Sequence, residues 1–213
     1  MKVALIGATG FVGSHILQEL VNRGYDVTAV ARSVEKIPVK GGKPKTVAVD
    51  VTDTEALASV LKGNDVVISA FNAGWSNPNI YDDFMKGSKA IQEAVEKADI
   101  KRYIVIGGGG SLFINGKQIV DDPGFPAQFK DGATAARDYL NLLKKETNLD
   151  WTFLSPALDM FPGERTGKYR LGTESPVFNG KGDSEISVQD LSVAIVDEID
   201  NHKFSRQRFT VGY

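Results

Sequence analysis

The chain has no cysteine, and its 213 residues include only two histidines, His15 and His202, near opposite ends. Without cysteine there is no disulfide, no thiolate nucleophile and no cysteine-ligated zinc. Two distant histidines exclude a multi-histidine metal site and argue against a histidine-based catalytic triad. We therefore expect no metal centre.

Neither sign of charge dominates, since 25 basic and 27 acidic side chains leave a formal net charge of -2. This balance gives no electrostatic reason to expect nucleic acid or an anionic membrane as a partner. No apolar run approaches the roughly 18 residues of a membrane-spanning helix. Met1 and Lys2 lead directly into an apolar run, which leaves no room for a signal peptide. We expect a cytoplasmic protein.

Glycine, by contrast, is abundant: 22 residues, where roughly 7% of a chain is usual. The first cluster follows an apolar run at residues 2–6 and precedes apolar residues with helical spacing at 14–21. Gly24 ends that helix, and a second apolar run follows at 27–31. The order strand, glycine turn, helix, strand predicts one βαβ unit.

The alternation continues along the chain. Strands are expected at 46–49, 65–71, 102–106 and 151–154, with a final edge strand at 208–211. Helices are expected after Thr52 or Asp53 as N-cap, at 81–98, at 132–147, and at 188–199 with Ser187 as cap. This pattern predicts an α/β fold, a doubly wound parallel sheet with helices on both faces.

We expect one Rossmann-like domain over residues 1–213. Residues 156–186 lack strong periodicity and carry several glycines and prolines. Because ligands bind at the carboxyl ends of strands in such sheets, this loop-rich segment is expected to cover that edge and shape a substrate pocket.

The first glycine cluster has the spacing of a dinucleotide-binding loop. Gly7 permits the tight turn, Gly10 lets the backbone approach a pyrophosphate, and Gly13 allows the helix to pack closely. Free amides at the helix start then face the phosphates. The expected cofactor contacts are Gly7, Ala8, Thr9, Gly10, Phe11, Val12 and Gly13. The alternative is a glycine turn that binds nothing.

The end of the second strand indicates the form of the cofactor. NAD-type sites carry an acidic residue there to bind the ribose 2′-hydroxyl. This strand ends at Ala31 and is followed by Arg32, which can pair with a 2′-phosphate and stack on adenine. The sequence therefore favours NADP(H) over NAD(H), unless Arg32 is a solvated surface cation.

Two further strand ends border the expected adenosine. Asp50 and Val51 are positioned for the adenine edge, although Asp50 equally suits an N-cap or turn. Ala70 and Phe71 lie where the backbone would pass beneath the ribose, although Phe71 equally suits the core.

These residues resemble atypical and extended short-chain dehydrogenases/reductases. The likeness is closer to a group of NAD(P)H-flavin reductases related to NmrA-like proteins and biliverdin reductase B. It rests on residues 7–13, 107–112, 150–157, 162–170 and 187–192. Chains with this N-terminal motif often carry the family label epimerase/dehydratase.

Members that reduce carbonyls or epimerise sugars usually carry Tyr-x-x-x-Lys on a helix, after a strand-end serine. Here Tyr139 is followed four residues later by Leu143, and Lys144 lies one residue further, about 100° around the helix. The catalytic pair is therefore absent. Transfer of hydride to a flavin or bilin tolerates this loss, because a conjugated acceptor spreads the charge and solvent can protonate it later.

The resemblance also implies the surroundings of the nicotinamide. Gly107 and Gly108 would lie beside it, Pro156 would border it, and Ser111 is the candidate catalytic residue. Ser111 equally suits a capping or turn role.

Other polar and aromatic residues are weaker candidates. Trp75 and Phe161 could stack on a planar substrate, although aromatic residues are more often core. Arg137 more often suits a surface ion pair than an anionic substrate, and His15 more often suits a structural role. The cations Arg165, Lys168 and Arg170 could attract a phosphate-bearing substrate such as FMN or simply face solvent.

We therefore expect an NAD(P)H-dependent reductase acting on a flavin or similar planar acceptor. The alternatives are a non-catalytic NADP(H)-binding redox sensor and a sugar-nucleotide epimerase or dehydratase. A homo-oligomer is possible, but no exposed apolar helix face indicates one.

Overall fold

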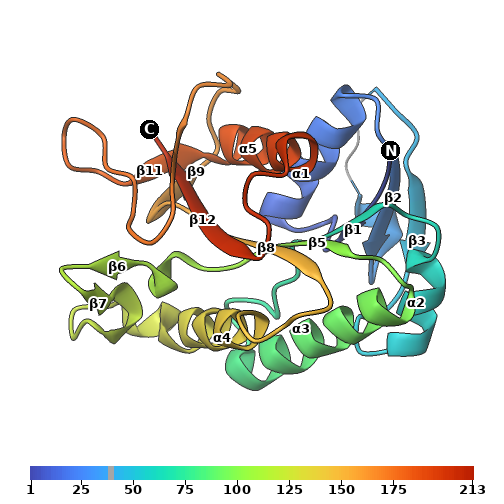
Figure 1. Ribbon diagram of the computed structural model, residues 1–213, viewed down its shortest axis with the longest axis horizontal. Coiled ribbons are helices and arrows are strands. Elements are labelled where there is room, and N and C mark those ends of the chain that lie inside the picture. The colour runs from blue at the N-terminus through green and yellow to red at the C-terminus, as the bar shows by residue number, and fades with distance from the viewer. Residues whose placement is uncertain (38–40) are drawn as a thin grey trace.

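The computed structural model describes residues 1–37 and 41–213 (Figure 1). The first half of the chain forms β1 (Lys2–Ile6), α1 (Phe11–Asn22), β2 (Asp26–Ala31), β3 (Lys45–Ala48), α2 (Thr54–Leu61), β4 (Val66–Ser69), α3 (Ile80–Lys97) and β5 (Arg102–Ile106). The second half forms β6 (Phe113–Ile114), β7 (Lys117–Gln118), α4 (Ala127–Leu143), β8 (Asp150–Ser155), β9 (Asp159–Phe161), β10 (Arg170–Gly172), β11 (Glu185–Ser187), α5 (Val188–Asn201) and β12 (Gln207–Gly212).

Among the described residues, the main sheet has eight strands in the order β10-β12-β8-β5-β4-β1-β2-β3. All neighbours pair in parallel except β10, which is antiparallel to β12. Helices α1 and α5 cover one face, and α2, α3 and α4 cover the other (Figure 1). The doubly wound parallel sheet is therefore confirmed.

Local capping follows the sequence. The Asp53 carboxylate accepts a hydrogen bond from the Ala56 amide at 3.0 Å, and the Ser187 hydroxyl accepts one from the Asp190 amide at 3.1 Å. Gly24 has a φ of +76° where helix α1 ends. These caps fix where the helices begin and end relative to the sheet.

Two expectations about the second half are wrong in detail. Helix α4 spans Ala127–Leu143 rather than 132–147. Its first turn was missed because those residues are exposed and have no apolar periodicity. Strand β12 is not the edge of the sheet, since β10 pairs outside it. Strands β9, β10 and β11 have only three residues each, too few to produce a recognisable alternation.

The loop-rich segment 156–186 lies on the same side of the molecule as the β6–β7 hairpin, at the left of Figure 1. No helix within residues 1–37 and 41–213 is both long and apolar enough to cross a membrane. A cytoplasmic location stays a prediction.

Candidate functional site

The glycine loop between β1 and α1 has the geometry that its sequence predicts. Gly7 has a φ of +81°, and a Cβ there would lie 2.6 Å from the Ala70 carbonyl oxygen. A Cβ on Gly13 would lie 2.1 Å from the Gly7 carbonyl oxygen. Both positions therefore require glycine. At Gly10 the nearest atom to a Cβ would be 3.4 Å away, an ordinary van der Waals contact, so packing does not require glycine there.

The start of helix α1 is suited to an anion. Gly10 is its N-cap and supplies no side chain to cap the first turn, which also contains no acidic residue. The first-turn amides of a helix have no partners within the helix, and the helix dipole favours negative charge beside them. Thr9, Gly10 and Phe11 are exposed, whereas Ala8 and Gly13 are buried. This cradle fits a pyrophosphate.

At the ends of β2 and β3, Arg32 and Asp50 lie close enough to interact electrostatically. The backbone amide and hydroxyl of Thr52 donate to Asp50 at 2.9 and 2.7 Å and lower the pKa of its carboxyl group. The charges of Arg32 and Lys86 act in the same direction. Asp50 thus has the turn role we considered. Its contact with adenine, like that of the half-buried Val51, stays a prediction.

Arg32 is exposed and has no hydrogen-bonded or ion-paired partner in the part of the chain that the structure describes. Its guanidinium is therefore available to a ligand. Its contact with a 2′-phosphate stays a prediction.

Ala70 and Phe71 follow β4 and lie against the glycine loop and helix α3, respectively. The Ala70 Cβ would be 3.4 Å from a Cβ on Gly13. Phe71 stacks on Phe84 with ring centroids 6.0 Å apart. The core role of Phe71 is therefore present, and its position beneath a ribose stays a prediction.

The loops after β5 and β8 pack directly against each other. A Cβ on Gly107 would lie 1.8 Å from the Phe153 ring, and one on Gly109 would lie 2.9 Å from the Pro156 carbonyl oxygen. Gly108 faces helix α4, where its Cβ would be 3.3 Å from that of Ala136. Glycine at these positions lets the two loops and α4 approach closely.

Ser111 ends the short 3₁₀ turn Gly109–Ser111 and is only 1% exposed. Its hydroxyl lies 3.2 Å from the Gly108 carbonyl oxygen and 3.1 Å from the Ser155 hydroxyl. It also accepts a hydrogen bond from Arg208 at 3.2 Å. Ser111 therefore lies in a buried polar cluster, and its catalytic role stays a prediction.

Helix α4 carries no tyrosine–lysine pair at the carboxyl edge. Tyr139 is fully buried, and its hydroxyl contacts Tyr103 at 3.3 Å and Gln92 at 3.2 Å. Burial raises its pKa well above the ordinary value. Lys144 is the exposed C-cap at the carboxyl-terminal end of the same helix.

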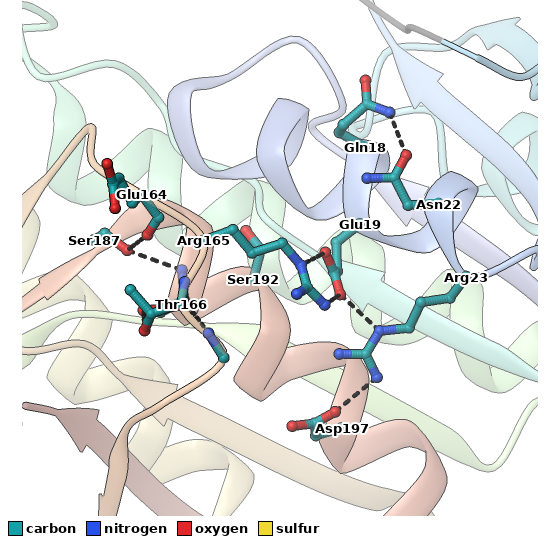
Figure 2. A network of polar contacts seen from close by, with 12 residues as sticks. Gln18, Glu19, Asn22, Arg23, Glu164, Arg165, Thr166, Ser187, Ser192 and Asp197 are labelled. Carbon is teal, nitrogen blue, oxygen red and sulfur yellow. Dashed lines mark hydrogen bonds and ion pairs between the residues drawn. The ribbon is translucent and has the colours of Figure 1, made fainter.

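The cations of the loop-rich segment mostly bind the protein itself. Arg165 forms a two-pronged ion pair with Glu19 of α1 at 2.7 and 2.8 Å, and Arg23 joins the same carboxylate at 2.6 Å (Figure 2). Arg170 donates to the carbonyl oxygens of Phe178 and Tyr213. Both arginines thus have partners within the protein, although their side chains are also exposed to solvent.

Sequence reasoning missed this network. Arg165 holds the pKa of the Glu19 carboxyl below its usual range, against the opposing effect of burial. The available signal was an acidic residue between the apolar positions of α1. Arg23 also donates a hydrogen bond to the carboxylate of Asp197 in α5, at 2.6 Å (Figure 2). The network fastens the loop-rich segment to both helices on this face.

The remaining candidates are exposed or half-buried. Arg137 pairs with Asp121 at 2.8 Å and Asp138 at 3.0 Å, which agrees with a surface ion pair. His15 contacts the Phe11 carbonyl oxygen at 2.7 Å. Trp75 is 55% exposed and makes an edge contact with Phe129 at 5.3 Å, whereas Phe161 is half-buried in β9.

Comparison with known proteins indicates the family to which the chain belongs. Residues 7–202 match a family described as NAD(P)H-binding. The uncharacterized protein YwnB of Bacillus subtilis is 34% identical over 99% of this chain and 98% of its own length. A Bacteroides thetaiotaomicron structure provisionally named an epimerase is 45% identical, with a TM-score of 0.92, and 100% of this chain and 96% of that chain are covered. A Streptococcus pneumoniae structure provisionally named an NADH-flavin reductase is 36% identical, with a TM-score of 0.87, and 100% and 99% are covered.

Proposed function

The chain belongs to the NAD(P)H-binding family, and from this premise we propose that it is an NADPH-dependent reductase of a flavin or similar planar acceptor. When bound, the cofactor supplies a hydride. The first-turn amides of α1 hold its pyrophosphate, and Arg32 pairs with the 2′-phosphate. With the adenosine at the end of β2, the nicotinamide would lie on the other side of β1, near the loops after β5 and β8; the strand order supports this arrangement.

The burial of Tyr139 is the observation that favours a conjugated acceptor over an isolated carbonyl. Reduction of an isolated carbonyl creates an alkoxide, which needs a positioned proton donor. Tyr139 is 0% exposed and hydrogen-bonded away from the carboxyl edge. A conjugated ring system delocalises the transferred charge, so the protein needs chiefly to hold two planar rings in contact.

An apolar rim at the carboxyl edge supports a planar acceptor. Phe11 is 46% exposed at the start of α1, and Leu158 is 46% exposed in the loop after β8. Trp75 and Phe129 add a 55% and a 42% exposed aromatic side chain from the loop after β4 and the start of α4. Exposed apolar side chains on several segments at this edge favour an aromatic ring over a polyhydroxylated sugar.

A redox sensor that binds NADP(H) without chemistry is the second candidate, because the same lack of proton-transfer groups suits it. A sugar-nucleotide epimerase needs an acid/base group to replace the tyrosine–lysine pair, and Tyr139 does not provide one.

A screen of NADPH oxidation against FMN, FAD, riboflavin, quinones and bilins tests the proposal, with NADPH binding measured in parallel by calorimetry. A reductase consumes NADPH in proportion to enzyme and acceptor. Tight NADPH binding without consumption would favour the sensor, and no binding of either nicotinamide cofactor would overturn both.

A further inference from the structure

A buried guanidinium joins three segments near the carboxyl edge. Arg208 lies in β12 level with Phe153 of β8, and its side chain is only 1% exposed. Its Nη1 donates to the Ser111 carbonyl oxygen at 3.0 Å and to the Ser111 hydroxyl at 3.2 Å. Nε and Nη2 donate to the carboxylate of Glu174 in the loop-rich segment.

Ser111 also contacts strand β8. Its hydroxyl lies 3.1 Å from that of Ser155, the last residue of β8. Ser155 is followed directly by Pro156, whose carbonyl oxygen lies against Gly109. The series Arg208, Ser111, Ser155 therefore links the loops after β5 and β8, which flank the position proposed for the nicotinamide.

The chemistry of arginine makes this link rigid. A charged group removed from water is tolerated only where its N–H groups find partners. The guanidinium is planar with a fixed fork of donors, so it orients the main chain and the hydroxyl of Ser111 together. Glu174 supplies the counter-charge, and its own carbonyl oxygen accepts a hydrogen bond from the Phe113 amide at 2.8 Å.

We propose that Arg208 is a positioning residue for the nicotinamide half of the site. It acts through Ser111 and Ser155 and holds the loops after β5 and β8 at the spacing that the nicotinamide ring requires. This inference rests on the cofactor of the proposed function but not on the identity of the acceptor.

Arg102 provides a matched control. It is also a buried strand arginine, with a side chain 9% exposed, and it pairs with Glu198 at 2.8 Å. It is the first residue of β5 and therefore lies at the opposite, amino end of the sheet. Replacement of either arginine by lysine keeps the charge and removes the fork, so the two variants make the same chemical change at opposite ends of the sheet.

The test compares Arg208→Lys, Ser155→Ala and Arg102→Lys in the full chain. Affinity is measured for NADPH and for adenosine 2′,5′-bisphosphate, which carries the adenosine end without the nicotinamide. We expect Arg208→Lys to weaken NADPH binding about tenfold, the scale of one charged hydrogen bond. Binding of the bisphosphate should stay within about twofold, as for a distant site.

Amide hydrogen exchange of the cofactor-free protein gives a second readout. Exchange should rise in residues 107–111 and 155–158 in Arg208→Lys and Ser155→Ala, but not in Arg102→Lys. If Arg208→Lys does not fold, Ser155→Ala carries the test alone. Equal loss of affinity for both ligands, or unchanged exchange in these loops, would overturn the proposal. If the wild-type protein binds NADPH without oxidising it, and Arg208→Lys still loses affinity for NADPH but not for the bisphosphate, only the proposed reductase activity would be overturned.

Discussion

The two ends of the sheet each contain a buried arginine, but its surroundings differ. At the amino end, Arg102 bonds to Glu198, itself 3% exposed, and to the Thr152 hydroxyl at 2.6 Å. Towards the carboxyl end, Arg208 pairs with Glu174, whose side chain is 56% exposed. Both members of the Arg102–Glu198 pair are buried, whereas the Arg208–Glu174 pair has an exposed carboxylate in the loop-rich segment. We infer that the amino end provides stability and the carboxyl end provides the site.

Loss of the acidic partner at the amino end should have the largest effect. Glu198 also accepts hydrogen bonds from the amides of Phe204 and Lys203. Glu198→Ala leaves the buried Arg102 with only its longer ion pair to Asp150, at 3.6 Å. The free energy of unfolding should therefore fall by about 3 kcal/mol in denaturant titrations, the lower end for a broken buried pair. NADPH affinity of the folded fraction should be unchanged, and a large loss there would contradict the division between the two ends.

At the carboxyl end, the glycine loop should be the most sensitive element. Gly13→Ala would put a Cβ 2.1 Å from a backbone oxygen, so the loop must move. We expect NADPH affinity, measured by calorimetry, to fall about a hundredfold, because two or more amide–phosphate hydrogen bonds are lost. Gly180→Ala is the matched control, since no atom lies within 4 Å of a Cβ there. Similar NADPH affinities for the two variants would show that the glycine loop does not bind the pyrophosphate.

The adenosine end should determine the choice between cofactors. Arg32→Ala should weaken NADPH binding about tenfold to a hundredfold, the scale of charge-assisted hydrogen bonds, and leave NADH binding nearly unchanged. Both affinities are measured on the same protein, so NADH serves as the internal control. Equal losses for both cofactors would rule out the 2′-phosphate assignment.

The apolar rim should affect the acceptor more than the cofactor. Trp75→Ala should raise the KM for riboflavin about threefold to tenfold at constant kcat, because a stacked aromatic contact is lost. Leu142→Ala, at a 38% exposed position in the last turn of α4, controls for loss of apolar surface. An unchanged KM in Trp75→Ala would exclude Trp75 from the acceptor site.

The smallest effect is expected in the core between helix α4 and the sheet, at Tyr139. Tyr139→Phe removes a buried hydroxyl that contacts Gln92 and Tyr103, and steady-state kcat should change less than about threefold. A hundredfold loss of kcat, the scale of general acid–base catalysis, would show that Tyr139 transfers a proton.

Local signals made the first half of the chain predictable. The β1–α1–β2 unit has a strong apolar period, glycine at required positions and caps that the structure contains. The positions of Arg32 and the glycine loop could be predicted from that unit, because both directly follow strands and so lie at the carboxyl edge of the sheet. The absence of a tyrosine–lysine pair also followed from helical spacing alone.

Long-range pairing made the rest inaccessible. Arg165 and Glu19 are 146 residues apart in sequence, and Arg208 and Ser111 are 97 apart. A charged residue inside the expected strand 208–211 was the one signal for Arg208, and it does not identify a partner. The exposed first turn of α4 and the three-residue strands β9 to β11 had no periodicity to reveal them.

The most direct test of the central claim is NADPH consumption with riboflavin by the purified chain under anaerobic conditions, with Gly13→Ala run beside it. The account predicts consumption proportional to wild-type enzyme and riboflavin, and almost none with Gly13→Ala. Tight NADPH binding by the wild-type protein without consumption, with riboflavin or any other planar acceptor of the screen, would contradict it.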